Sequence, residues 1–257
     1  MYHRGAGDRS GQIMKDKFVL VTGSSSGIGR AITEHLLKAG ATVFGIARNH
    51  TKFKPNTDKY KTFEIDVSDL KTLPGNLNEI IAENPCLNGL VSNAGYGIFG
   101  GLESFSAEQI SSFIGANLTS HIVITRSVLP YFKLKDQSDI IFIGSEAAHE
   151  GGKKGSLYCA AKFGLRGFSQ TIRDECADKN VRVSLINPGM VRTSFFEDLN
   201  FGPGDDPANA IEADDIALAA MSILSSRPGT VIDEINMTPL KKVIKFGIKN
   251  NPVKRKG

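Results

Sequence analysis

Short apolar runs alternate with longer amphipathic stretches along most of the chain. Runs rich in β-branched residues predict seven strands, over residues 17–23, 41–48, 60–66, 87–95, 139–145, 181–189 and 229–236. Between most of them, apolar residues recur at helical spacing, as over residues 28–40, which end in glycine. This alternation predicts an α/β fold: a doubly wound, mostly parallel seven-stranded sheet with helices on both faces. Residues 51–59 carry a proline and little periodicity, so we expect at most a brief helix there.

The length of 257 residues suits one large domain, which we place at residues 14–240. Residues 1–13 are polar and aperiodic, and we expect a disordered arm or a vector-derived remnant. Residues 193–211 form a long aperiodic connection with glycine, proline and three phenylalanines, which predicts a mobile lid over the substrate. Phe195, Phe196 and Phe201 could equally anchor that lid to the body.

The net charge of +4 is unevenly distributed. Residues 241–257 form a basic tail, with seven lysines or arginines and no acidic residue from Thr238 onward. Such a tail can contact nucleic acid or anionic lipid, but it is more often solvated, and we expect neither a nucleic-acid nor a membrane partner. No apolar run approaches the roughly 20 residues that span a bilayer. The three cysteines have no metal-ligand spacing, so we expect no metal site and a reducing, cytoplasmic location.

The segment "TGSSSGIG" lies between the first predicted strand and the first predicted helix. Glycines at this place allow a tight turn, a close backbone approach to a pyrophosphate and close helix packing, while the helix N-terminus attracts the anion. The alternative is an ordinary turn. The predicted dinucleotide contacts in this segment are Gly23, Ser24, Ser25, Ser26, Gly27, Ile28 and Gly29.

The second predicted strand ends in Ala47 and Arg48, with no carboxylate. An acidic residue at this position would bind the ribose 2′-hydroxyl of NAD(H), whereas an arginine accommodates the 2′-phosphate of NADP(H). We therefore expect NADP(H) to be preferred over NAD(H). The residue before Gly27 is Ser26 and not a second basic residue, which weakens this preference.

Tyr158 and Lys162 are one turn apart on a predicted helix that runs from an N-cap at Ser156 to about Cys176. A free phenol has a pKa near 10, and a neighbouring ammonium favours the phenolate, so the pair is suited to acid–base chemistry. Ser145 ends a strand at the edge where open α/β sheets bind ligands. Asn117 lies on an apolar stripe, where a buried amide needs hydrogen-bond partners. Taken singly, each residue could instead be structural.

Together these residues resemble the short-chain dehydrogenase/reductase family over residues 17–236. The matching segments are "TGSSSGIG", "DV" at Asp66 and Val67, "SNAG" from Ser92, "YCAAK" from Tyr158 and "NPGMVRT" from Asn187, together with Asn117 and Ser145. Ser92 and Gly144 depart from the family pattern, but neither is a reacting group.

The resemblance implies a Rossmann-type fold, a nicotinamide cofactor and the catalytic tetrad Asn117, Ser145, Tyr158 and Lys162. It places Asp66, Val67, Asn93, Ala94 and Gly95 on the adenine side. Pro188, Gly189, Val191 and Thr193 are implied at the nicotinamide end, where Tyr158 and Lys162 also contact the cofactor. It further implies a homodimer or homotetramer.

The sequence thus predicts an NADP(H)-dependent oxidoreductase acting on a small-molecule carbonyl or secondary alcohol, possible substrates being a small 3-hydroxy acid or a 3-oxoacyl compound. Lys153 and Lys154 could hold a substrate carboxylate, although solvated loop lysines are the simpler interpretation. The alternative is a catalytically idle NADP(H)-binding sensor, which would more naturally lack Tyr158 or Lys162. A nucleic-acid or membrane-associated protein would rest on the basic tail alone.

Overall fold

A computed structural model describes residues 14–247, and the expected N-terminal arm and residues 248–257 of the basic tail lie outside this range. Its centre is a seven-stranded sheet in the order β10-β6-β5-β4-β1-β2-β3, in which every neighbouring pair is parallel. The predicted doubly wound fold is confirmed. Its strands are β1 (Phe18–Thr22), β2 (Thr42–Ala47), β3 (Tyr60–Glu64), β4 (Gly89–Ser92), β5 (Ser138–Ile143), β6 (Val181–Pro188) and β10 (Glu234–Met237).

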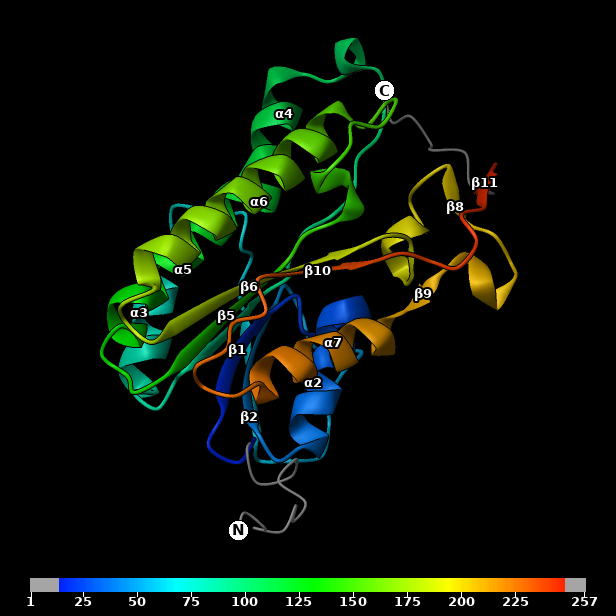
Figure 1. Cartoon of the computed structure of the whole chain (residues 1–257). Coiled ribbons are helices and arrows are strands. Elements are labelled where there is room, and N and C mark those ends of the chain that lie inside the picture. The colour runs from blue at the N-terminus through cyan, green and yellow to red at the C-terminus, as the bar shows by residue number, and fades with distance from the viewer. Residues whose placement is uncertain (1–13, 248–257) are drawn as a thin grey trace.

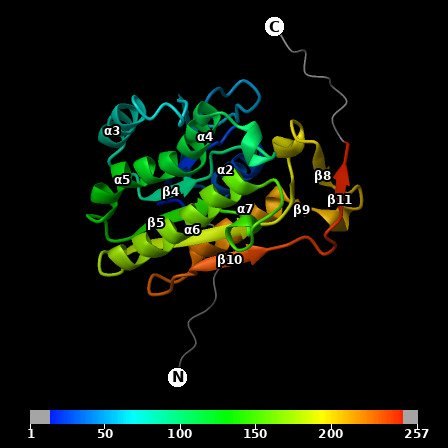
Figure 2. The same ribbon diagram turned by 90° about the horizontal axis from the view of Figure 1, so that it is seen from above.

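Helices cover both faces of the sheet, as Figures 1 and 2 show. Two pack on one face: α2 (Gly27–Lys38) and α7 (Ala213–Ser225). The other face carries α3 (Leu73–Glu83), α5 (Ser120–Phe132) and α6 (Ser156–Cys176), and α4 (Ala107–Ile114) precedes α5. Each face has its own apolar core, because the β-branched strands are buried on both sides. None of the described helices is both long enough and apolar enough to cross a membrane.

Three local elements were expected from the sequence: a brief helix at most, an N-cap and a strand. Residues 51–59 contain no helix, as their proline and weak periodicity predict. Ser156, expected as an N-cap, is instead the first residue of α6, and Gly155 takes the cap position without any side-chain hydrogen bond. The strand expected over residues 229–236 is formed only from Glu234, because the preceding residues make a turn.

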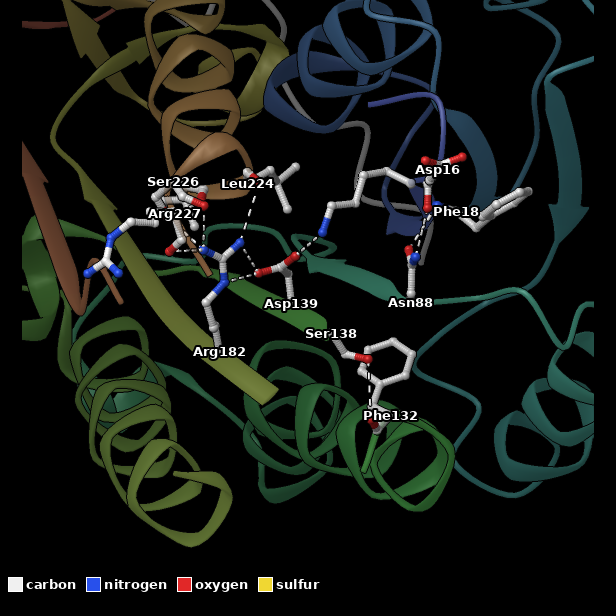
Figure 3. A network of polar contacts seen from close by, with 12 residues as sticks. Asp16, Phe18, Asn88, Phe132, Ser138, Asp139, Arg182, Leu224, Ser226 and Arg227 are labelled. Carbon is white, nitrogen blue, oxygen red and sulfur yellow. Dashed lines mark hydrogen bonds and ion pairs between the residues drawn. The ribbon is translucent and has the colours of Figure 1, made fainter. Parts of the chain in front are cut away.

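A buried charge network joins the amino ends of the central strands (Figure 3). Asp139 in β5 accepts hydrogen bonds from Lys17 Nζ at 2.6 Å and from Arg182 in β6 at 2.7 Å. The Arg182 guanidinium also donates to Ser226 after α7, with a distance of 2.7 Å to the Ser226 hydroxyl. Buried charges are tolerated when they are paired in this way. The network lies at the edge of the sheet opposite the carboxyl ends of the strands.

The expected lid and the first part of the basic tail form a small structure together. Within residues 193–211, β8 (Phe201–Pro203) pairs antiparallel with β11 (Ile244–Phe246), and β9 (Ile211–Glu212) pairs with β7 (Val191–Arg192). In both views β8 and β11 lie side by side at the end of the molecule away from α3 (Figures 1 and 2). Residues 241–247 are therefore joined to the segment 193–211 by a strand pairing, although they are exposed.

Candidate functional site

The predicted site residues follow the carboxyl ends of six parallel strands. Because the register aligns Thr22 with Ile46, Ser92 with Phe142 and Ile143 with Ile186, these ends meet at one edge of the sheet. In the sheet, β1 lies between β2 and β4. The helix before β2 is α2 and the helix before β4 is α3, and these two helices cover opposite faces of the sheet. Such a switch point is where open α/β sheets bind their ligands.

The glycine-rich turn after β1 has the geometry of a phosphate cradle. Gly23 and Gly27 have φ angles of +69° and +52°, in the left-handed region that favours glycine. A Cβ atom on Gly29 would lie 2.3 Å from the carbonyl oxygen of Gly23, so no larger residue fits at this helix start. The side chain of Ser26 does not cap α2, which leaves backbone N–H groups of the first turn for an anion. These residues fit the pyrophosphate of a dinucleotide.

Ser24, expected to contact the cofactor, has its side chain turned toward the sheet. Its side chain is buried, and its hydroxyl forms a hydrogen bond with the hydroxyl of Tyr60 in β3, at 3.0 Å. Tyr60 also bonds to His50 Nδ1 at 3.1 Å. The Ser24 side chain therefore anchors the turn to the sheet, while the more exposed Ser25 and Ser26 remain at its surface.

The residues expected on the adenine side gather around the ends of β1 to β4. Arg48 directly follows β2, is exposed and forms no ion pair with another described residue. Asp66 accepts hydrogen bonds from the backbone nitrogen and hydroxyl of Ser68, at 2.9 and 2.7 Å. The adjoining Val67 is half-buried against the apolar core.

The segment Asn93–Gly95 is held against the end of β1. The backbone nitrogens of Asn93 and Ala94 both donate to the hydroxyl of Thr22, at 2.9 and 3.0 Å. A Cβ atom on Gly95 would lie 2.6 Å from Asn117 Oδ1, so glycine permits the two segments to approach.

Asn117 lies in a π-helical turn, Gly115–Thr119, between α4 and α5. Such single turns interrupt α-helices frequently at functional sites. Asn117 is 1% exposed, its Oδ1 accepts from the backbone nitrogen of Tyr96 at 3.0 Å, and its Nδ2 donates to the Phe113 carbonyl at 3.1 Å. The hydrogen bonds that a buried amide needs are thus made to the backbone.

Ser145, Tyr158 and Lys162 come together where α6 crosses the end of β5. The Ser145 side chain lies near the Tyr158 phenol and acts to lower its pKa. One turn further along α6, the amine of Lys162 donates to the Ile143 carbonyl at 3.0 Å and lies 5.8 Å from the centre of the Tyr158 ring. The sequence prediction that these three residues lie together agrees with this geometry.

Burial governs the ionisation of this group. It raises the pKa of Tyr158 to about 12, and the Ser145 side chain only partly opposes this. Burial also lowers the pKa of Lys162 to about 8. In this arrangement desolvation of the phenol raises its pKa, and the expected lowering by Lys162 stays a prediction.

The segment after β6 completes the site from the other side. Gly189 follows Pro188 and donates from its nitrogen to the Met237 carbonyl at 2.7 Å. Val191 is buried, and the Thr193 hydroxyl accepts from the Phe195 nitrogen at 3.3 Å. A Cβ atom on Gly27 would lie 3.5 Å from the Thr193 side chain, so this segment lies next to the glycine-rich turn.

Two polar contacts beside the tetrad were not predicted. Asn187 Oδ1 accepts from the Ser145 nitrogen at 3.2 Å, and its Nδ2 donates to Glu234 at 2.8 Å. At the end of β4, Ser92 bonds through its hydroxyl to His121 Nδ1 at 2.7 Å. Burial, aided by the charge of Lys162, lowers the pKa of His121 to about 3, which keeps it neutral. Two features of the sequence could have pointed to these contacts: the asparagine of the "NPG" segment, and the serine at position 92, which departs from the family pattern.

Comparison with known proteins gives a consistent result. A family profile described as short chain dehydrogenase matches residues 17–203. The NADP-dependent 3-hydroxy acid dehydrogenase of Schizosaccharomyces pombe is 29% identical over 241 residues, covering 87% of this chain and 92% of that protein. The 3-oxoacyl-(acyl-carrier-protein) reductase of Haemophilus influenzae is 32% identical over 228 residues, covering 85% of this chain and 94% of that protein.

Solved structures share the architecture. A metagenomic short-chain oxidoreductase in complex with NADP is 28% identical and has a TM-score of 0.75, with 87% of this chain and 97% of that chain covered. A 3-ketoacyl-(acyl-carrier-protein) reductase from Brucella melitensis, complexed with NADH, reaches a TM-score of 0.79 at 21% identity, covering 90% of this chain and all of that one, which shows the fold alone. The motifs, the sheet and these relatives agree: the chain belongs to the short-chain dehydrogenase/reductase family of oxidoreductases.

Proposed function

We propose that this oxidoreductase uses NADP(H) to interconvert a carbonyl compound and a secondary alcohol, with Tyr158 as the acid and base. The observation that carries the proposal is the grouping at the end of β5, where Ser145 lies near the Tyr158 phenol and the amine of Lys162 lies 5.8 Å from the centre of the Tyr158 ring. A dinucleotide held by its pyrophosphate at the glycine-rich turn would supply or accept the hydride at C4 of its nicotinamide.

The side chains of the site act on the substrate oxygen. Tyr158 donates a proton to the carbonyl oxygen as the carbonyl carbon gains the hydride, and Ser145 polarises the same oxygen by donating a hydrogen bond. A phenol whose pKa is about 12 is protonated at neutral pH, which is the form that can donate a proton to the carbonyl oxygen. Lys162, whose pKa is near 8, helps to return a proton to the phenolate, and Asn117 supports the path to solvent.

Arg48 is the basis for proposing NADP(H) over NAD(H). Its exposed, unpaired guanidinium follows β2, where the 2′-position of the adenosine ribose is expected. No carboxylate occupies this strand end to bind a 2′-hydroxyl instead. The NADP-dependent relative and the NADP-bound solved structure support the same choice.

The names of the relatives suggest two substrate classes, 3-hydroxy acids and 3-oxoacyl compounds. The surroundings of Ser145 favour the second class, because Glu146 directly follows Ser145 and its carboxylate would repel a carboxylate on the substrate. Lys153 and Lys154 are exposed, as expected of solvated loop lysines.

Self-association is proposed through the outer face of α5 and α6. An apolar groove there is lined by Ile122, Thr125, Arg126, Leu129, Pro130, Lys133, Phe168 and Ile172. Ile122 and Phe163 expose apolar surface on the same two helices. A homodimer or homotetramer would cover this face, and a monomer in sedimentation analysis would contradict it. The free thiols of Cys86, Cys159 and Cys176 support a reducing, cytoplasmic location.

The first experiment follows nicotinamide absorbance with NADP+ or NAD+ and secondary alcohols: 3-hydroxy acids, 3-hydroxyacyl thioesters, sugars and steroids. We expect turnover of one class with NADP+, its loss in Tyr158→Phe, and NADPH binding by that variant close to native. Turnover that survives in Tyr158→Phe would show that another acid acts. NADPH binding without turnover across these classes would instead favour a sensor.

A further inference from the structure

Aromatic rings surround the reacting phenol. The rings of Phe99 and Phe195 lie 5.2 and 6.0 Å from the Tyr158 ring, between centroids. Phe201 packs against Phe99 at 4.9 Å, and Phe196 lies between Phe195 and Phe201, at 5.1 and 5.9 Å. We call these four residues, with Phe246, the aromatic wall. All these distances lie in the range of favourable ring contacts.

Three segments far apart in the sequence build the aromatic wall. Phe99 follows "SNAG", Phe195 and Phe196 belong to the 3-10 helix Ser194–Phe196, and Phe201 begins β8. β11 supplies the last member, because Phe246 pairs with Phe201 in the register of the two strands and their rings are 6.4 Å apart.

Ion pairs hold β11 and the residues before it in place. Lys241 pairs with Asp206 at 3.5 Å, Lys242 pairs with Glu146 at 2.8 Å, and Lys245 pairs with Asp205. Each pair is exposed and individually weak, but three of them act together with the strand pairing. Lysines of the basic tail that suggested an anionic partner are thus used to fix the C-terminal segment over the lid.

The carboxylate beside Ser145 disfavours a second carboxylate on the substrate. Glu146 directly follows Ser145 and, after burial, is among the causes that raise the pKa of Tyr158. The nearby cation Lys242 is already paired with this carboxylate. A carboxylate on the substrate would have to compete with Glu146 for Lys242, and the Glu146 carboxylate would repel it.

We propose that the site selects an uncharged carbonyl compound with an aromatic ring or a comparably flat apolar group beside the reacting carbon, and that Phe246 in β11 helps to select it. This inference rests on the proposed function for its reacting atoms. A ring in contact with the aromatic wall buries apolar area and gains ring contacts, which together amount to about a tenfold preference or more.

Four compounds separate ring from charge: ethyl benzoylacetate, benzoylacetate, ethyl acetoacetate and acetoacetate. With the full chain and saturating NADPH, we expect kcat/KM for ethyl benzoylacetate to be at least tenfold higher than for benzoylacetate, which adds the charge, and than for ethyl acetoacetate, which lacks the ring. An equal or higher kcat/KM for acetoacetate would overturn the inference.

Binding separates this inference from the proposed function. Calorimetry of the same compounds with the complex of Tyr158→Phe and NADP+ should give the same order of affinity. Tight binding of ethyl benzoylacetate without turnover by the native protein would contradict the proposed function and support the aromatic selectivity. If ethyl benzoylacetate binds no more tightly than acetoacetate, the aromatic selectivity is wrong.

Variants test the members of the aromatic wall. Phe201→Leu keeps the apolar volume but removes the ring, and Phe246→Ala removes the contribution of β11. We expect each to reduce the preference for the benzoyl ester to about threefold or less. Leu240→Ala is the matched control, because Leu240 is exposed in the same segment and should keep the native preference. A native preference in Phe246→Ala would overturn the role of β11.

Discussion

The backbone nitrogen of Ser145 donates a hydrogen bond to Asn187 Oδ1 at 3.2 Å, which ties the end of β5 to the end of β6. Asn187 Nδ2 donates to Glu234 and Asn236, at 2.8 and 3.0 Å, and both of these residues lie in β10. Asn187 is 1% exposed, and Glu234 also accepts from Arg166 in α6 at 3.2 Å. The position of Ser145 therefore depends on three neighbouring strands and on the helix that carries Tyr158.

Asn187→Ala should lower kcat more than it changes the KM for NADPH. The variant leaves the buried Ser145 N–H without its acceptor, which costs about 1–3 kcal/mol. Since a small displacement of a positioned group costs up to about 10²-fold in rate, we expect kcat to fall by about 10- to 100-fold. Steady-state kinetics with a working substrate measure this. Asn236→Ala is the control, because it removes a partner of the amide without touching Ser145, and an equal loss there would contradict the positioning role.

Arg48→Ala should weaken NADPH binding far more than NADH binding. A charge-assisted hydrogen bond contributes about 1.5–3 kcal/mol, so we expect a loss of about 10- to 100-fold for NADPH and little change for NADH. Fluorescence titration with both cofactors gives the two dissociation constants. Arg48→Lys keeps the charge and should show an intermediate NADPH affinity. Equal losses for both cofactors in Arg48→Ala would exclude a 2′-phosphate contact.

Lys162→Met should change how stability depends on pH. Burial lowers the pKa of Lys162 to about 8, so between about pH 8 and its ordinary value near 10.5 the unfolded chain binds more protons at this residue than the folded one. The contribution of Lys162 to the free energy of unfolding therefore rises with pH across that window, by an amount on the order of 3 kcal/mol. Below pH 8 Lys162 is charged in the folded protein as well, so the full cost of burying the charged amine lowers the free energy of unfolding.

Urea unfolding of the native protein and Lys162→Met, from pH 7 to pH 10, measures the difference. We expect the native protein to gain stability relative to the variant as the pH rises. The lost hydrogen bond to the Ile143 carbonyl adds a constant offset, so the slope is the informative quantity. Parallel stability curves would show that Lys162 is not desolvated.

The sequence predicted the sheet because strands such as β5 and β6 are buried on both faces and therefore read as continuous apolar runs. It also predicted which segments reach the site, since the carboxyl ends of parallel strands share an edge. The pairing of β8 with β11 was not predictable, because both strands are three residues long and more than 40 residues apart. A local pattern carries no information about such a partner.

The surroundings of Tyr158 were not predictable for a related reason. Spacing along α6 identifies Lys162 as its neighbour, but it does not reveal Phe99 and Phe195, which approach from distant segments and help to bury the phenol. Burial by such tertiary contacts raises the pKa of the phenol. The bonds of Asn187 to Ser145 and Glu234 escaped prediction in the same way, since they join three strands.

Asp139→Ala should destabilise the protein without changing the chemistry. The variant leaves the buried Lys17 and Arg182 without their shared carboxylate (Figure 3), and breaking a buried ion pair costs about 3–5 kcal/mol. Because the network lies at the amino ends of the strands, kcat of the folded protein should remain close to native. Urea unfolding and kinetics at low temperature measure the two effects separately. Asp136→Ala, at an exposed position three residues earlier, is expected to change stability by no more than about 0.5 kcal/mol, and a similar loss in both variants would contradict a special role for the buried network.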